Sequence, residues 1–258
     1  MPLTNQYNLP DALIDAIKND PYTKGKGKYS ITELLNPPQV AILKQRYKDK
    51  ITTDVSDEIW RLFGKSFHAY IGSYQKSDVL TEEIYYKEIE GVLIKAQADA
   101  VYTNALLDDY KVTSVYTVRN GSRMNDWEWQ TNGYAWILEE NGYEVKELRI
   151  IAIMRDWHEG NKVKQRNYPV CQIQPIYIKR KSNEEIAEYF TERVKLFEKN
   201  YERPDSLLKE CTEAERWIDN ARCRKYCEGS SFCKQWEMMK FIAEKEKQAD
   251  KTISAQGD

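Results

Sequence analysis

Apolar residues follow two spacings along the chain, one typical of helices and one of strands. Over residues 54–74 they recur at i, i+3 and i+4, which predicts an amphipathic helix that also carries His68. Over residues 81–117 they gather in short runs of Ile, Val, Tyr and Leu between turn residues, which predicts two or three antiparallel strands. Residues 145–157 and 168–178 have the composition of two further strands.

Capping and breaking residues indicate where other helices begin and end. Asn36-Pro37-Pro38 breaks the chain before a helix, Asn141-Gly142 ends another, and Ser182-x-x-Glu185 is a capping box that opens a third. The helices expected on this basis cover residues 10–19, 40–47, 126–140 and 182–200. This order of helices and strands, without a repeat of fixed period, predicts an α/β fold in which a mixed central sheet is flanked by helices.

Length and composition set the scale of the fold. The 258 residues, 41% of them hydrophobic, suffice for one sizeable core with an elaboration. We expect an N-terminal helical and basic segment (1–53), a core (54–203), a cysteine cluster with a C-terminal helix (204–245) and a flexible tail (246–258). The chain has neither the roughly 18 apolar residues of a membrane span nor a secretory signal, which predicts a cytoplasmic protein without membrane contact.

Charge is distributed unevenly, although its sum is small. The formal net charge of −2 is unlike that of a strongly basic nucleic-acid-binding domain. Locally, residues 160–181 contain six basic residues and no acidic one, and residues 18–50 contain eight basic and three acidic. Either stretch could follow a phosphate backbone or form an ordinary solvated face.

Asp99, Asp109 and Lys111 lie in the segment where strands are expected. Residues i and i+2 of a strand share a face, so Asp109 and Lys111 point one way while Tyr110 points into the core. A hairpin can bring Asp99, near the end of the preceding strand, beside them. Two carboxylates without a cysteine among them make an oxygen-rich site for a hard cation such as magnesium or manganese.

The lysine would contribute different chemistry. Its ammonium can help to deprotonate a water and can stabilise the charge that grows on a phosphate. Taken alone, Asp-x-Lys is equally the pattern of a surface strand with an ion pair. The apolar flanks Leu106-Leu107 and Val112 favour a buried strand, in which such charges are usually paired or functional. The segment therefore indicates phosphodiester hydrolysis.

The chain resembles the PD-(D/E)xK nuclease superfamily in the type and order of these and several other residues. Within it, the resemblance is to the branch that includes the RecB nuclease domain, lambda-type exonucleases and the CRISPR-associated adaptation nucleases. Besides Asp99 and Asp109-Tyr110-Lys111, it rests on Gly64-Lys65-Ser66-Phe67-His68, on Gln130-Thr131-Asn132-Gly133-Tyr134 and on the entry segment Tyr29-Ser30-Ile31-Thr32-Glu33-Leu34. The resemblance implies a restriction-endonuclease-like fold with a cysteine-containing C-terminal elaboration.

The resemblance also implies roles for these residues. His68, Asp99, Asp109 and the backbone carbonyl of Tyr110 would hold one or two divalent ions, and Lys111 would activate the attacking water. Gln130 and Tyr134, four residues apart on one helix face, would hold substrate phosphate or base. Other candidates are Glu82 and Glu83 as additional ligands and His158 in a structural role.

The cysteines point to a second metal. Five is an odd number, which argues against a full set of disulfides, and Cys211, Cys223, Cys227 and Cys233 are clustered like the ligands of zinc or an iron–sulfur cluster. The last three resemble the C-terminal trio of the iron–sulfur branch of these nucleases. Cys171 falls within an expected strand and is predicted to be a buried small side chain.

This chain differs from the iron–sulfur branch in the position of the fourth cysteine. In that branch the fourth cysteine precedes a proline near the N-terminus, where this chain has Asn36-Pro37-Pro38. Cys211 could substitute and give a local cluster or a zinc knuckle, or the metal could be lost.

Together these features predict a metal-dependent DNA nuclease of bacterial or phage origin. The preferred form is an exonuclease that acts on DNA ends or single strands in recombination, repair or replication. The alternatives are a structure-specific or defence endonuclease on the same fold and a DNA-binding module that does not cleave. A helicase or a single-strand annealing protein would be a partner for the Lys/Glu-rich C-terminal helix, and the sequence fixes no oligomeric state.

Overall fold

The computed structural model describes residues 2–19, 25–74 and 79–254. The chain forms two compact units. One, the sheet unit, comprises Asn5–Leu35 and Asp54–Val194, and the other, the cysteine unit, comprises Met1–Thr4, Asn36–Thr53 and Lys195–Asp258. The candidate metal residues lie in the first unit and the clustered cysteines in the second.

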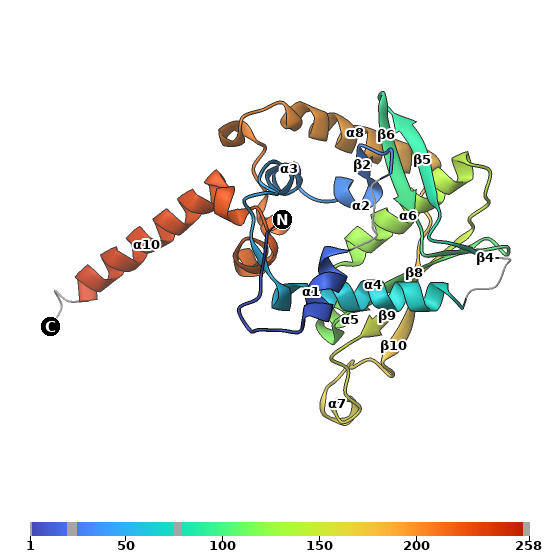
Figure 1. Ribbon diagram of the computed structural model, residues 1–258, viewed down its shortest axis with the longest axis horizontal. Coiled ribbons are helices and arrows are strands. Elements are labelled where there is room, and N and C mark those ends of the chain that lie inside the picture. The colour runs from blue at the N-terminus through green and yellow to red at the C-terminus, as the bar shows by residue number, and fades with distance from the viewer. Residues whose placement is uncertain (1, 20–24, 75–78, 255–258) are drawn as a thin grey trace. The chain divides into compact units, whose positions relative to one another are not determined.

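Two sheets form the centre of the sheet unit (Figure 1). The larger has the order β10-β9-β8-β7-β4, with a parallel pair β8–β9 and antiparallel pairs elsewhere. The smaller has the order β2-β6-β5, in which β2 is parallel to β6. The strands are β2 (Tyr29–Ser30), β4 (Val79–Thr81), β5 (Ile84–Ile89), β6 (Val92–Gln97), β7 (Ala100–Tyr102), β8 (Leu106–Thr113), β9 (Glu147–Met154) and β10 (Ile173–Ile178).

Helices accompany these sheets in the sheet unit, which confirms the predicted α/β class. They are α1 (Asp11–Lys18), α2 (Ile31–Leu34), α4 (Ile59–Gly72), α5 (Val115–Asn120), α6 (Met124–Glu140), α7 (Asn161–Lys164) and α8 (Asn183–Tyr201), the last shared with the cysteine unit. The α6 helix contacts β5 and β6 of one sheet and β8 and β9 of the other. Every residue from 130 to 138 is therefore buried, because the helix has sheet on both sides.

The main differences from the predicted elements have local causes. Residues 79–113 form five strands instead of two or three, because β4 and β7 have only three residues each and show no periodicity. The helix predicted from residue 54 starts as a 3-10 turn over Val55–Glu58 before α4 begins. No side chain of α4 is buried, so its apolar residues pack less than the pattern implied.

The cysteine unit contains β1 (Leu3–Thr4), which pairs with β3 (Thr53–Asp54), α3 (Pro38–Arg46), α9 (Glu213–Arg216) and α10 (Lys234–Ser254). Short 3-10 or π turns cover Asp205–Leu207, Ile218–Asn220, Arg222–Tyr226 and Ser230–Phe232. Its small core consists of Ile42, Leu43, Leu208 and Cys233, and Tyr47 stacks on Phe232 with ring centroids 4.0 Å apart.

The last helix extends beyond residue 245, after which the sequence analysis placed a flexible tail. The α10 helix continues to Ser254 and so includes much of the segment expected to be flexible. Lys, Glu, Gln and Ala have high helix propensity, which explains why a polar sequence can extend the helix. Among the residues described, no helix is long and apolar enough to cross a membrane.

Candidate functional site

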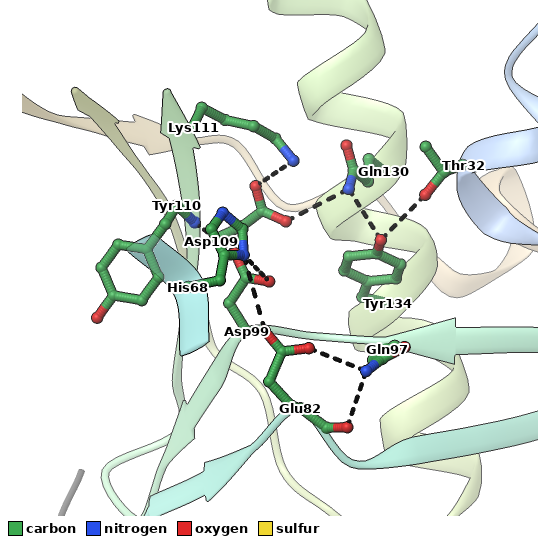
Figure 2. A network of polar contacts seen from close by, with 10 residues as sticks. All are labelled: Thr32, His68, Glu82, Gln97, Asp99, Asp109, Tyr110, Lys111, Gln130 and Tyr134. Carbon is green, nitrogen blue, oxygen red and sulfur yellow. Dashed lines mark hydrogen bonds and ion pairs between the residues drawn. The ribbon is translucent and has the colours of Figure 1, made fainter. Parts of the chain in front are cut away.

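The β8 strand presents its two adjacent aspartates to opposite faces. Asp109 is 1% exposed, and its Oδ2 lies 2.6 Å from the ammonium of Lys111 (Figure 2). Asp108 points the other way and forms a two-bond pair with the guanidinium of Arg149, at 2.7 Å for both bonds. The alternation of a strand thus places Asp109 and Lys111 together, as the sequence predicts.

Asp99 lies beside this pair because the chain turns directly from it into β7 and then β8. Its Oδ2 accepts a hydrogen bond of 2.6 Å from the backbone N–H of Tyr110. Its Oδ1 lies 3.2 Å from Nδ1 of His68, which α4 provides. The Tyr110 ring lies on the other side of β8, 6.2 Å from the rings of both Phe67 and His68.

Glu82 is a third carboxylate at this position, which the sequence identified only as a possible ligand. Its Oε1 lies 3.7 Å from Nδ1 of His68, and the Gln97 amide donates to its Oε2 at 2.9 Å and to its carbonyl at 3.0 Å. Glu82 has a φ of 53°, a conformation that costs an L residue about 1–2 kcal/mol. This strained turn before β5 directs the carboxylate toward His68, and a turn residue of this kind has no periodic signal in the sequence.

Burial and charge act in opposite directions on the two titratable groups at the centre. Burial lowers the pKa of His68, but hydrogen bonds to Asp99 and Glu82 outweigh it and raise that pKa to about 10. Burial raises the pKa of Asp109 to about 6, although the Lys111 ammonium acts to lower it. The site therefore holds a protonated imidazole among carboxylates at neutral pH.

A polar chain on α6 connects Asp109 to the start of α2. The Gln130 amide donates to Oδ1 of Asp109 at 3.3 Å and to the Tyr134 hydroxyl at 2.8 Å. The same hydroxyl lies 3.1 Å from Oγ1 of Thr32 (Figure 2). The helix spacing of four residues predicted that Gln130 and Tyr134 share one face, whereas Thr32 was noted only as part of the entry segment.

The donor set fits a divalent cation. His68, Glu82 and Asp99 each offer one ligand atom, and these atoms lie within 4.8 Å of one another. Oδ2 of Asp109 is buried without a hydrogen bond of normal geometry and faces only the Lys111 ammonium among the partners that the structure describes. Carboxylate oxygens with one imidazole suit magnesium or manganese.

The three ligand candidates line a cavity of about 630 Å³ in the sheet unit. Its walls include Tyr134 and three basic side chains, Arg61, Lys65 and Lys95. Lys95 is 2% exposed, and burial lowers its pKa. A cavity of this volume with cationic walls beside carboxylates can hold a nucleotide-sized anion at a metal.

The structure thus brings together His68, Asp99, Asp109, Lys111, Gln130 and Tyr134 (Figure 2). Tyr110 contributes its backbone N–H to Asp99, and the use of its carbonyl as a ligand stays a prediction. Glu83 accepts a hydrogen bond from Tyr85 and is outside the ligand group, and the His158 imidazole accepts one from the backbone of Gly160, a structural contact.

The four clustered cysteines line one small cavity in the cysteine unit. Cys211 and Cys233 are buried, Cys223 and Cys227 are half-buried, and all four are free thiols. Burial raises the pKa of Cys211 to about 12 and that of Cys227 to about 11, so the thiols are protonated without a metal.

The start of α3 forms part of the same cavity. Gln39 and Val40 line it, directly after Pro37-Pro38, and the Cys211 thiol lies 3.5 Å from Oε1 of Gln39. Cys211 therefore lies beside the residues that directly follow Pro37-Pro38.

Cys171 was predicted wrongly. It is exposed and lies before β10, which begins at Ile173, so it is neither buried nor within a strand. The turn residues of the preceding segment delay the start of the strand, and the Cys171 thiol contacts the carbonyl of Ile173.

Comparison with known proteins supports the fold. No protein-family model and no curated protein matches the sequence. The solved structure of the protein SSO0001 is similar with a TM-score of 0.54 at 17% identity, over 87% of this chain and 95% of that one. At this identity the similarity shows a shared fold.

Two exonuclease structures are more distant. A candidate exonuclease from Eubacterium rectale has a TM-score of 0.35 at 16% identity, over 69% of this chain and 66% of that one. A phage-related exonuclease from Haemophilus somnus has a TM-score of 0.32 at 13% identity, over 74% and 79%. These scores are too low to show a common fold.

Proposed function

We propose that the protein is a divalent-metal-dependent deoxyribonuclease of the PD-(D/E)xK type. The observation that carries the proposal is the buried Asp109–Lys111 pair beside the ligand group His68, Glu82 and Asp99. Burial of an aspartate that lacks a full set of hydrogen bonds is unfavourable for folding, and such strain concentrates at functional sites. A module that only binds DNA would gain nothing from carboxylates close to phosphate.

Each residue has a task that follows from its position. His68, Glu82, Asp99 and Asp109 would hold a divalent ion, which would supply Lewis-acid activation of water and neutralise phosphate charge. The Lys111 ammonium orients the attacking water and stabilises the negative charge of the transition state. Asp109 holds this ammonium at 2.6 Å, which keeps the lysine beside the carboxylates that would bind the metal.

The α6 chain orients Asp109 from the other side. Gln130 donates to Oδ1 and Lys111 contacts Oδ2, so both side chains would orient Asp109 toward a metal. Tyr134 is buried, and burial raises its pKa, so its hydroxyl remains protonated as a hydrogen-bonding group. Gln130 and Tyr134 therefore fix geometry and contact substrate, and they do not transfer protons.

The cysteine cavity is proposed to hold a second metal centre with a structural role. An iron–sulfur cluster is preferred to a single zinc ion because Cys223, Cys227 and Cys233 resemble the C-terminal trio of the iron–sulfur branch, and Cys211, which lines the same cavity, would be the fourth ligand.

The preferred mode is exonucleolytic, in recombination, repair or replication, and it is tested by the shape of the substrate. Wild-type protein and Asp109→Ala are incubated with end-labelled linear DNA and with covalently closed circular DNA, in magnesium, in manganese and in chelator. We expect wild type to degrade linear DNA only with metal and to spare the circle.

Cleavage of the circle would replace the exonuclease by the endonuclease alternative. Catalysis at this site would be overturned if wild type cleaved none of the substrates or if the Asp109→Ala variant kept full activity. The protein would then be the DNA-binding module that does not cleave. RNA of the same sequence, tested in parallel, shows whether the enzyme selects DNA.

A further inference from the structure

The α4 helix exposes a row of aromatic rings. Trp60, Phe63, Phe67, Tyr70 and Tyr74 recur at spacings of three, four, three and four, which places them on one stripe of the helix surface and of the turn that follows it. All except Phe67 are exposed, by 54% for Trp60, 48% for Phe63, 63% for Tyr70 and 71% for Tyr74. We call these five residues the aromatic stripe.

Core packing does not account for the aromatic stripe. No residue of α4 is buried, and within the part of the chain that the structure describes only Phe67 among the five contacts a ring of the sheet, that of Tyr110 at 6.2 Å. The other rings contact each other in pairs, with centroids 6.2 Å apart for Trp60–Phe63 and 5.1 Å for Tyr70–Tyr74. Single exposed apolar residues are common, but a continuous row of them indicates a binding surface.

The charge along the aromatic stripe indicates the kind of partner. Residues 59–74 contain no aspartate or glutamate, in a chain with 41 acidic residues, and their two cations, Arg61 and Lys65, line the cavity on another side of the helix. The Arg155 guanidinium lies 4.9 Å from the Trp60 ring, which adds a cation at one end. A surface that combines flat apolar rings with positive charge is complementary to a polyanion with flat apolar groups.

We propose that the aromatic stripe is a stacking platform for the bases of single-stranded DNA. Bases within a duplex are already stacked on one another, so only a single strand or a frayed end can use these rings. The inference rests on the proposed function and names its substrate as a strand with unpaired bases.

The helix itself connects the platform to the metal site. His68 follows Phe67 and is rotated from it by about 100° around the helix axis. His68 lies between the rings and the cavity residues Arg61 and Lys65, which are farther around the helix. A strand bound to the rings would therefore reach the cavity by passing the His68 side of α4.

Binding in chelator separates this inference from catalysis. The affinity for a fluorescently labelled thymidine oligonucleotide and for a blunt duplex of equal length is measured by anisotropy. The variants are Phe63→Leu and Tyr70→Leu, which keep apolar bulk but remove the ring, and Tyr7→Leu serves as a control, since Tyr7 is 69% exposed outside α4. We expect each stripe variant to bind the single strand about tenfold more weakly, with a smaller change for the duplex.

The outcomes distinguish the alternatives. Unchanged single-strand affinity in both stripe variants would overturn the platform. Light scattering tests the other occupant. If wild type is a dimer and both stripe variants are monomers, the surface binds a second copy of the chain and the proposal is equally overturned. If wild type binds single strands through the stripe but hydrolyses nothing with manganese, the proposed function fails while the platform stands.

Discussion

Two neighbouring aspartates show how the same side chain takes different roles in one strand. Asp108 has both oxygens bonded to Arg149, whereas Asp109 relies on Lys111 and one amide of Gln130. The alternation of β8 and the Asp-x-Lys pattern predicted the second arrangement. The Arg149 partner, 41 residues away from Asp108, was not predictable, because it depends on the parallel pairing of β8 with β9.

Metal binding is expected to release a proton from His68. The carboxylates of Asp99 and Glu82 raise the pKa of His68 to about 10, and a metal must displace that proton. Between pH values of about 6 and about 10, manganese affinity should therefore rise about tenfold per pH unit. Titration calorimetry in buffers of different ionisation enthalpy measures the proton release, and His68→Gln should abolish it. If His68→Gln released as many protons on manganese binding as wild type does, His68 would not be a metal ligand.

The unfolding free energy of the metal-free protein should depend on pH through the titration of Asp109. A carboxyl whose pKa is raised from 3.8 to about 6 binds its proton more tightly in the folded state. Its contribution to the unfolding free energy therefore decreases as pH rises through that window, and it remains lower above it. Asp109→Asn should remove this decrease in urea unfolding, while Asp11→Asn, a change at an exposed aspartate, should retain it. If the unfolding free energy of wild type and of Asp109→Asn depended on pH in the same way, burial of the charged Asp109 carboxylate would carry no cost.

At the scale of elements, sequence predicted the helices better than the strands. Caps and breakers gave α1, α3, α6 and α8 within a few residues, because these signals are local. The short strands β4 and β7 form through pairing with neighbours and have no pattern of their own. Glu82 entered the site only through the turn between β4 and β5, which explains why the sequence did not select it over Glu83.

The packing of α6 can be tested with two glycines. A Cβ at Gly133 would lie 2.7 Å from the Phe190 ring and 3.1 Å from Ile31, whereas a Cβ at Gly64 on α4 would meet nothing within 4 Å. Gly133→Ala should therefore lower the unfolding free energy by about 1–3 kcal/mol. Gly64→Ala should raise it by about 0.5–1 kcal/mol through helix propensity. Thermal unfolding followed by circular dichroism checks both, and equal effects would contradict the described packing.

The metal centre proposed in the cysteine cavity can be tested by comparing a substitution of Cys211, a proposed ligand, with one of Cys171, which lies outside the cavity. Cys211→Ser should remove the visible absorption and the bound iron of protein purified without oxygen, because it removes one of four thiolates. Cys171→Ser should leave both unchanged, since Cys171 is exposed and outside the cavity. Stoichiometric zinc without absorption would favour the zinc alternative. Absence of any metal in wild type would show that the site is lost.

At the scale of the whole molecule, DNA binding cannot come from net charge. The formal charge of −2 leaves binding to local features, namely basic side chains at the cavity and a metal that offsets the carboxylates. The two compact units each hold one candidate metal centre. The candidate metal centre of the sheet unit was predictable in outline because its motif residues fall within about 70 positions in sequence, whereas the cavity around it required the assembled sheets.

The most direct test of the account compares the two adjacent aspartates of β8. Manganese-dependent hydrolysis of end-labelled linear DNA is measured for wild type, Asp109→Asn and Asp108→Asn, with circular dichroism to confirm folding. We predict that Asp109→Asn loses at least about a thousandfold in rate, as expected when a metal ligand at the reacting phosphate is removed. Asp108→Asn, which faces the other side of the sheet, should stay within about tenfold of wild type. Equal losses in the two variants, or an active Asp109→Asn, would contradict the account.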